Sequence, residues 1–74
     1  MVPFLVEIEG YRARVERDRD GTLWGRVIEI DDVITFKAST MRVVETRFAK
    51  ALSAYFERCL QRGVPPQKPA PKGF

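Results

Sequence analysis

The sequence contains no histidine, so the most common general base and the most common zinc ligand are both missing. Its single cysteine, Cys59, cannot form a disulfide or a cysteine-based metal site within one chain. No glycine-rich phosphate-binding loop occurs, and the serines have no histidine to activate them. We therefore expect no catalytic residue, no metal, no cofactor and no enzyme activity.

The sequence also lacks the long apolar run, of about 18 residues, that a transmembrane helix needs. Its first seven residues have neither the basic region nor the long apolar core of a secretory signal. A chain with one thiol and no such signal is expected in the cytoplasm, without a membrane partner.

Acidic residues form two close pairs, Asp18 with Asp20 and Asp31 with Asp32. Such pairs are able to hold a divalent ion or to act as acid and base. Both pairs lie where β-turns favour aspartate, so we interpret them as turn residues.

The charge balance is modestly basic, with 13 Lys and Arg against 10 Asp and Glu and a net charge of +3. The arginines are interleaved with other residues rather than clustered, as at positions 12, 14, 17 and 19. We interpret them as a solvated surface, and binding of nucleic acid through these arginines is the alternative.

One strongly amphipathic stretch, Thr40–Arg62, predicts a helix around which the domain is organised. Thr40 fits an N-cap, and Gly63 fits a C-terminal stop that is followed by two prolines. The predicted core residues on its apolar face are Val44, Phe48, Leu52, Tyr55, Phe56 and Cys59, with Ala51 and Leu60 beside them. Cys59 is interpreted as a small buried hydrophobe.

The residues before this helix have β-strand patterns. Three strands joined by aspartate-containing turns are predicted at Tyr11–Glu16, Thr22–Ile28 and Val33–Lys37. Phe4–Ile8 is also apolar and β-branched, and Glu9-Gly10 breaks or bends it. The predicted fold is α+β, a three-stranded antiparallel meander covered on one face by one C-terminal helix. Residues 1–63 form the domain, and residues 64–74, with four prolines, form an extended tail.

One helix covers only one face of such a sheet. If Leu23 and Val27 enter the core, strand alternation places Trp24, Arg26 and Ile28 on the uncovered face, and these three are the candidate partner-binding residues. In the alternative register Trp24 belongs to the core. Because so small a core is marginal, we also expect a homodimer built through the sheet, which Trp24→Glu would disrupt.

The order of short motifs along the chain gives a further indication. These are Gly10-Tyr11, Val15-Glu16, the Asp20-Gly21 turn, Gly25–Ile28, Asp32–Phe36, Phe48, Tyr55–Cys59, Arg62-Gly63, Pro66-x-Lys68-Pro69 and Lys72–Phe74. In this order and at these spacings, the chain resembles the N-terminal domain of HicB-family antitoxins from about Gly10 to Phe74.

The resemblance implies a HicB-like fold, a partial RNase H-like fold without the nuclease carboxylates. It also implies binding to HicA, a small basic toxin that cleaves mRNA through a histidine and that the antitoxin occludes. Many members carry a C-terminal domain that binds DNA, whereas this chain stops at Phe74, so DNA binding is not expected. Acidic residues that relatives carry in the first helical turn are replaced by Met41, Arg42 and Val43. A homo-oligomeric or nucleic-acid-binding domain without a toxin partner is the alternative function.

Overall fold

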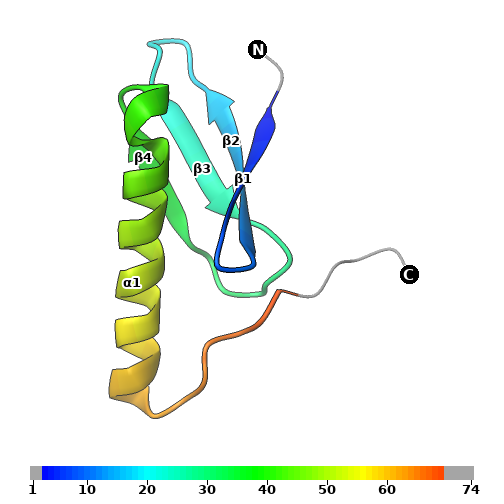
Figure 1. The fold of residues 1–74 in the computed structure, drawn as a ribbon, viewed down its shortest axis with the longest axis vertical. Coiled ribbons are helices and arrows are strands. Elements are labelled where there is room, and N and C mark those ends of the chain that lie inside the picture. The colour runs from blue at the N-terminus through cyan, green and yellow to red at the C-terminus, as the bar shows by residue number, and fades with distance from the viewer. Residues whose placement is uncertain (1–2, 70–74) are drawn as a thin grey trace, which may run out of the picture.

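A computed structural model describes residues 3–69 and shows an antiparallel sheet followed by one helix (Figure 1). The elements are β1 (Phe4–Ile8), β2 (Tyr11–Arg17), β3 (Leu23–Val27), β4 (Thr35–Ala38), the 3₁₀ turn η1 (Met41–Val43) and α1 (Val44–Arg62). The strand order is β1-β2-β3-β4, so every strand pairs with its sequence neighbours. The α+β class and the meander with one C-terminal helix are confirmed.

The predicted strand count was wrong, because the sheet has four strands rather than three. Phe4–Ile8 forms β1 and pairs with β2 from Phe4 opposite Val15 to Ile8 opposite Tyr11. The two residues between them, Glu9 and Gly10, have positive φ angles of 51° and 83°. Two central residues with positive φ are typical of a type I′ turn, which joins two antiparallel strands tightly. Glutamate seldom adopts this conformation, so the sequence suggested only a bend.

The predicted Asp-Gly hairpin turn is confirmed between β2 and β3. The backbone N–H of Asp18 donates to the carbonyl oxygen of Thr22 at 2.7 Å, and Gly21 takes a φ of 91°. The Asp20 carboxylate accepts from the backbone N–H of Thr22 at 2.9 Å. This hydrogen bond favours the charged carboxylate and holds the pKa of Asp20 below its usual value.

The helix ends where the sequence predicts but begins later. Thr40 has an extended backbone and makes no side-chain capping hydrogen bond, and η1 precedes the α-helical hydrogen bonding that starts at Val44. At the other end Gly63 takes a left-handed φ of 68°. The N–H groups of Gly63 and Val64 donate to the carbonyl oxygens of Leu60 and Cys59 at 3.2 and 3.0 Å. These are the two hydrogen bonds of a Schellman motif.

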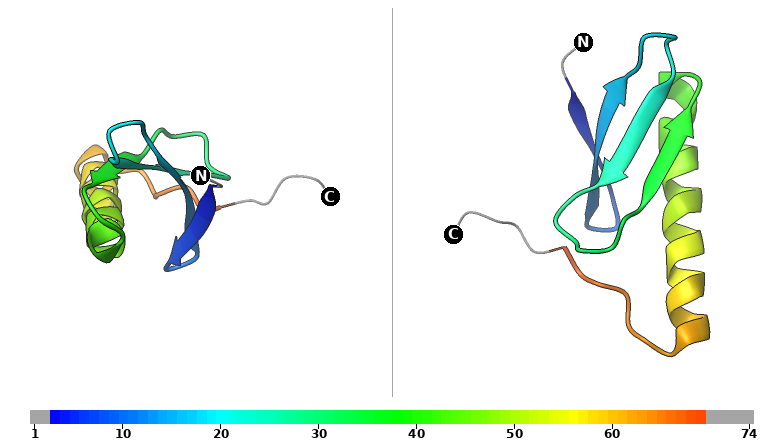
Figure 2. Two further views of the ribbon diagram at one scale, coloured as in Figure 1. Left: turned by 90° about the horizontal axis from the view of Figure 1, so that it is seen from above. Right: turned by 180° about the vertical axis from the view of Figure 1, so that it is seen from behind.

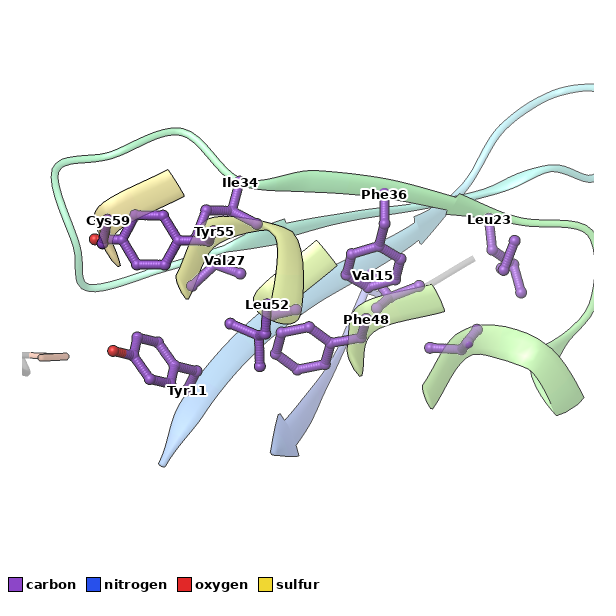
Figure 3. Packing of buried hydrophobic residues seen from close by; sticks show 13 residues of the cluster. Tyr11, Val15, Leu23, Val27, Ile34, Phe36, Phe48, Leu52, Tyr55 and Cys59 are labelled. Atoms are coloured by element: carbon purple, nitrogen blue, oxygen red, sulfur yellow. The ribbon is translucent and has the colours of Figure 1, made fainter. Parts of the chain in front are cut away.

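The core lies between α1 and the inner face of the sheet (Figure 3). The rings of Phe36 and Phe48 stack at its centre, with centroids 5.3 Å apart. Among residues 3–69, the thirteen buried apolar residues are Tyr11, Ala13, Val15, Leu23, Val27, Ile34, Phe36, Ala38, Val44, Phe48, Leu52, Tyr55 and Cys59. The apolar face expected for the helix is therefore buried at all of its predicted core positions but Phe56.

Two residues of that expected face depart from the prediction. Phe56 is only half-buried, and its ring contacts Tyr11 edge-on at 5.6 Å between centroids. Leu60 is 76% exposed. Phe56 and Leu60 lie four residues apart on one flank of the apolar face, whereas Cys59 between them in sequence is buried. The helix is also longer than the strands, since the 19 residues of α1 rise about 28 Å whereas a five-residue strand spans about 17 Å. The last helical turns consequently extend past the sheet (Figure 1).

Candidate functional site

The sheet has one face that α1 leaves uncovered, and we call it the open face (Figure 2). Burial alternates along each strand, so inward and outward side chains are clearly separated. The side chains that the strands turn to the open face are Leu5, Glu7, Arg12, Arg14, Glu16, Trp24, Arg26, Thr35 and Lys37. This mixture of one large aromatic and several charges defines the candidate site.

Trp24 is the dominant apolar side chain of the open face, with 45% of its surface exposed. Its neighbours Leu23 and Val27 are buried, which is the predicted register and not the alternative that placed Trp24 in the core. Lys37 lies directly opposite on β4, with its Nζ 5.2 Å from the centre of the Trp24 ring. This cation–π contact orients both side chains.

The structure brings the three predicted partner-binding residues together. Trp24, Arg26 and Ile28 line one shallow hollow of about 230 Å³, together with Arg14 and Thr35. Ile28 follows the last residue of β3, and its backbone N–H donates to the carbonyl oxygen of Arg12 at 2.9 Å. A second hollow, of about 420 Å³, extends from Arg14 and Ile28 to Pro3, Phe4 and Leu5. The open face is therefore hollowed from Trp24 across to the edge at β1.

The centre of the open face carries an unbalanced positive charge. Arg14 and Arg26 lie directly opposite each other on β2 and β3, an arrangement that destabilises a sheet unless the charges are compensated. Arg14 has only an exposed ion pair with Glu16 at 3.6 Å. Within residues 3–69, Arg26 has no ion pair. A negatively charged group supplied by a partner would offset this repulsion.

Arg12 differs from these two arginines because its charge is already paired. Its Nε and Nη2 donate to the two carboxylate oxygens of Glu29 at 2.9 and 2.5 Å. Glu29 holds this position with a left-handed φ of 69°. The hydrogen bond from Glu29 favours the charged guanidinium and raises the pKa of Arg12. Arg12 and Glu29 thus form one rigid pair at the margin of the open face.

A second feature, which we call the Gln67 clasp, fastens the chain after α1 to the end of the core. The backbone carbonyl of Gln67 accepts from the Tyr11 hydroxyl, its backbone N–H donates to the Tyr55 hydroxyl at 2.9 Å, and its side-chain oxygen accepts from the backbone N–H of Asp31 at 2.6 Å. The Tyr55 hydroxyl in turn donates to the Asp32 carboxylate at 2.7 Å. Residues 64–69 have no regular secondary structure, and these contacts still fix their path.

Sequence reasoning missed the clasp, although one signal for it exists. A buried tyrosine needs a hydrogen-bond partner for its hydroxyl, and Tyr55 lies on the predicted buried helix face. The turn pattern explains Asp31 and Asp32 as turn residues only, and the proline content of residues 64–74 predicts a plain extended tail. Of that tail, residues 70–74 lie outside the described residues.

The clasp predicts an alkaline loss of stability that depends on Tyr55. Burial, together with donation to Asp32, raises the pKa of Tyr55 to about 12. In the unfolded chain the pKa is about 10, so between these two values the folded state binds more protons and the free energy of unfolding falls as the pH rises. Urea unfolding from pH 9 to pH 12 should show this fall in the wild type and a shallower one in Tyr55→Phe.

Tyr55→Phe should also lower stability by about 1–3 kcal/mol at neutral pH, since it leaves the N–H of Gln67 and the carboxylate of Asp32 without this partner. Lysine titration occurs in both proteins and cancels in the comparison. Parallel curves for the two proteins above pH 10 would contradict the role assigned to Tyr55.

No other chemistry is visible in the described part of the chain. Among residues 3–69, no cluster of acidic, histidine or cysteine side chains has the composition of a metal site. No helix in this range has the length and apolar character needed to span a bilayer. Comparison of the chain with protein-family models, curated proteins and solved structures finds no match.

Proposed function

We propose that this chain is a protein-binding module that docks its partner on the open face. The observation that supports this function is Trp24, a large aromatic residue that is 45% exposed and lines a hollow of the sheet face that α1 leaves uncovered. Exposed aromatic residues beside arginine are typical anchors of protein interfaces. Arg26 and Ile28 line the same hollow and are the residues expected to act with Trp24.

We further propose, from the resemblance to HicB-family antitoxins, that the partner is a HicA-type toxin that cleaves mRNA. In this proposal the antitoxin acts by covering the toxin, so it requires no catalytic residue and no cofactor. A buried free thiol, Cys59, fits a reducing compartment, and we propose the cytoplasm as its location.

The charges of the open face favour a protein partner over nucleic acid. Single-stranded nucleic acid is bound along continuous positive grooves with aromatic platforms. Here Glu7 and Glu16 lie on the same face as the arginines and would repel a phosphate backbone. A protein with mixed charges is able to place a carboxylate at Arg14 and Arg26 and basic groups near these glutamates. Even a basic toxin must therefore present an acidic residue at the centre of the contact.

Co-expression with a HicA-type toxin tests the proposal. We expect the wild-type chain to restore growth and to co-purify with the toxin. Trp24→Ala should weaken binding by at least about 2 kcal/mol, roughly thirtyfold, if Trp24 is an anchor. The matched control is Leu60→Ala, which removes an apolar side chain that is 76% exposed on α1 and should leave binding unchanged.

Two results would contradict the proposed function. One is a toxin that is neither bound nor neutralised by the folded wild-type chain. The other is tight binding of single-stranded RNA with a steep salt dependence, which would favour the nucleic-acid alternative.

A further inference from the structure

The strand β1 lies at an edge of the sheet, so the backbone hydrogen-bonding groups of alternate residues have no partner within the sheet. In a two-residue hairpin the flanking residues, here Ile8 and Tyr11, form a hydrogen-bonded pair, and such pairs alternate along the strands. The backbone groups of Phe4, Val6 and Ile8 therefore point to β2, and those of Leu5 and Glu7 point to the free edge. The hydrogen bond from the Ile28 N–H to the Arg12 carbonyl supports this assignment. It shows that the backbone groups of Arg12 point to β3, so those of Tyr11 and Ala13 point to β1.

The side chains of β1 are covered less than those of any other strand. On the inner face Phe4, Val6 and Ile8 are only half-buried, whereas the inward-facing apolar side chains of β2, β3 and β4 are buried. The reason is the position of α1, which lies along the β4 side of the sheet (Figure 2). On the open face Leu5 is 53% exposed. Apolar side chains of β1 are therefore accessible from both faces of the sheet.

The opposite edge of the sheet is protected in a way that β1 is not. Lys37 of β4 and Arg47 of α1 line the same hollow beside that edge. Charged residues, lysine above all, are a common protection of edge strands against pairing with another chain. β1 reads Phe4-Leu-Val-Glu-Ile8; like β4 it has one charged residue, but this residue is Glu7 and the strand has no lysine. This asymmetry favours β1 as the edge at which a further strand is added.

We propose that β1 pairs antiparallel with β1 of a second copy of this chain, about a two-fold axis at Val6. Phe4 then lies opposite Ile8 of the second copy, and Leu5 lies opposite its Glu7. Leu5 and Glu7 have outward backbone groups, so each of the two Leu5–Glu7 pairs exchanges both of its hydrogen bonds, and the Phe4–Ile8 pairs contribute side-chain contacts only. The two four-stranded sheets become one continuous sheet.

The side chains of this register complement each other on both faces. On the inner face the half-buried Phe4, Val6 and Ile8 cover their counterparts and remove apolar surface from water. On the open face Leu5 lies between two residues on neighbouring strands. Arg14 of its own sheet is on one side, and Glu7 of the second copy is on the other. Arg14 and this Glu7 are two strand spacings apart, about 10 Å, a distance that their long side chains can span. The two-fold axis makes this ion pair twice.

A shift of the register by two residues in either direction also brings outward backbone groups opposite each other, but both of these registers are less favourable. A shift in one direction places the two Glu7 residues opposite each other, where like charges repel. A shift in the other direction brings Pro3 to a position that requires a backbone N–H, which proline lacks. The register centred on Val6 is the one that pairs all five residues of β1.

This dimer does not rest on the proposed function. Its contacts leave Trp24 and Arg26 free, and Arg14 is the one residue that the argument uses in both surfaces. It also moves the homodimer expected from the sequence from the open face of the sheet to its edge. Since the two-fold axis stands perpendicular to the joined sheet, both open faces point to the same side.

Analytical ultracentrifugation of the full chain tests the dimer with one substitution on each edge. We expect a dimer at micromolar concentration and a folded monomer for Leu5→Pro, with dimerisation weakened by at least about tenfold. Proline removes the outward N–H of Leu5, which the fold itself does not use, and is tolerated on edge strands. Lys37→Pro is the matched control, because the bond from Val27 N–H to the Ile34 carbonyl turns the Lys37 N–H to the outside of β4. It should remain a dimer.

A charge exchange tests the register even if Leu5→Pro does not fold. Glu7→Arg should weaken the dimer, and adding Arg14→Glu should restore it. The proposal is wrong if the folded wild-type chain is monomeric at about 100 µM, or if its dimer survives Leu5→Pro but dissociates with Trp24→Glu or Lys37→Pro. Loss of toxin binding by Trp24→Ala leaves this result unaffected, so the two proposals fail separately.

Discussion

Replacing Phe48 with alanine is expected to cost about 3–5 kcal/mol of unfolding free energy. The Phe48 side chain is completely buried and stacks on the Phe36 ring with an angle of 9° between the planes. Its removal leaves a cavity at the centre of the contact between α1 and the sheet, where neither layer is free to close it. A domain of this size is stabilised by only about 4–11 kcal/mol in total, so the variant should lie close to unfolding.

Urea unfolding followed by circular dichroism measures this loss. Leu60→Ala on the same helix is the matched control, because Leu60 is 76% exposed and its truncation should change stability by less than about 0.5 kcal/mol. Equal losses for the two variants would show that the helix packs through another face.

The substitution Gly25→Ala is expected to have the second large effect. The inner face of β3 has no side chain at Gly25, and the ring of Phe36 occupies that space from the opposite strand. A methyl group there would lie 2.1 Å from the Phe36 Cζ and 2.4 Å from its Cε1. The Phe36 ring is stacked on Phe48, so a shift of the ring away from the added methyl group would disturb this contact. Overpacking of this kind costs about 1–3 kcal/mol and at times more, and we expect the upper end.

A second substitution tests whether the loss comes from the collision with the Phe36 ring or from a general effect of alanine on β3. Phe36→Leu in the Gly25→Ala background should recover much of the loss, although Phe36→Leu alone is destabilising. Urea unfolding of the two single variants and the double variant gives the coupling between the positions. Additive losses would mean that the Phe36 ring is not the obstacle.

The features that the sequence predicts well are those with a periodic or local signal. The spacing of Val44, Phe48 and Leu52 identifies the buried helix face. Alternation along β3 puts Trp24 on the face opposite Leu23 and Val27, and the structure shows that the face of Leu23 and Val27 is the buried one. Gly63 marks the helix end because few other residues adopt the left-handed conformation there.

The features that it does not predict depend on local conformation or on distant contacts. β1 becomes a separate strand only because Glu9 takes a positive φ, which its residue type disfavours. Trp24, Arg26 and Ile28 line one hollow because they alternate along β3 and the residue after it. Their common face is therefore predictable from the pattern of a single strand. Placing Arg14 directly opposite Arg26 requires the pairing of β2 with β3, which no single strand pattern defines.

The Gln67 clasp has a consequence for the order of folding. Its Tyr11–Gln67 contact joins residues 56 positions apart, whereas the hairpins of the sheet close over short loops. Contacts between distant residues carry the larger loop-closure entropy, so the clasp should form after the sheet and helix have met. Interactions made late stabilise the native state without assisting the transition state, so loss of the clasp should speed unfolding and leave the folding rate nearly unchanged. The contacts of residues 64–69 then slow the unfolding of a domain that is already folded. Stopped-flow experiments on Tyr55→Phe should show a faster unfolding rate and a nearly unchanged folding rate.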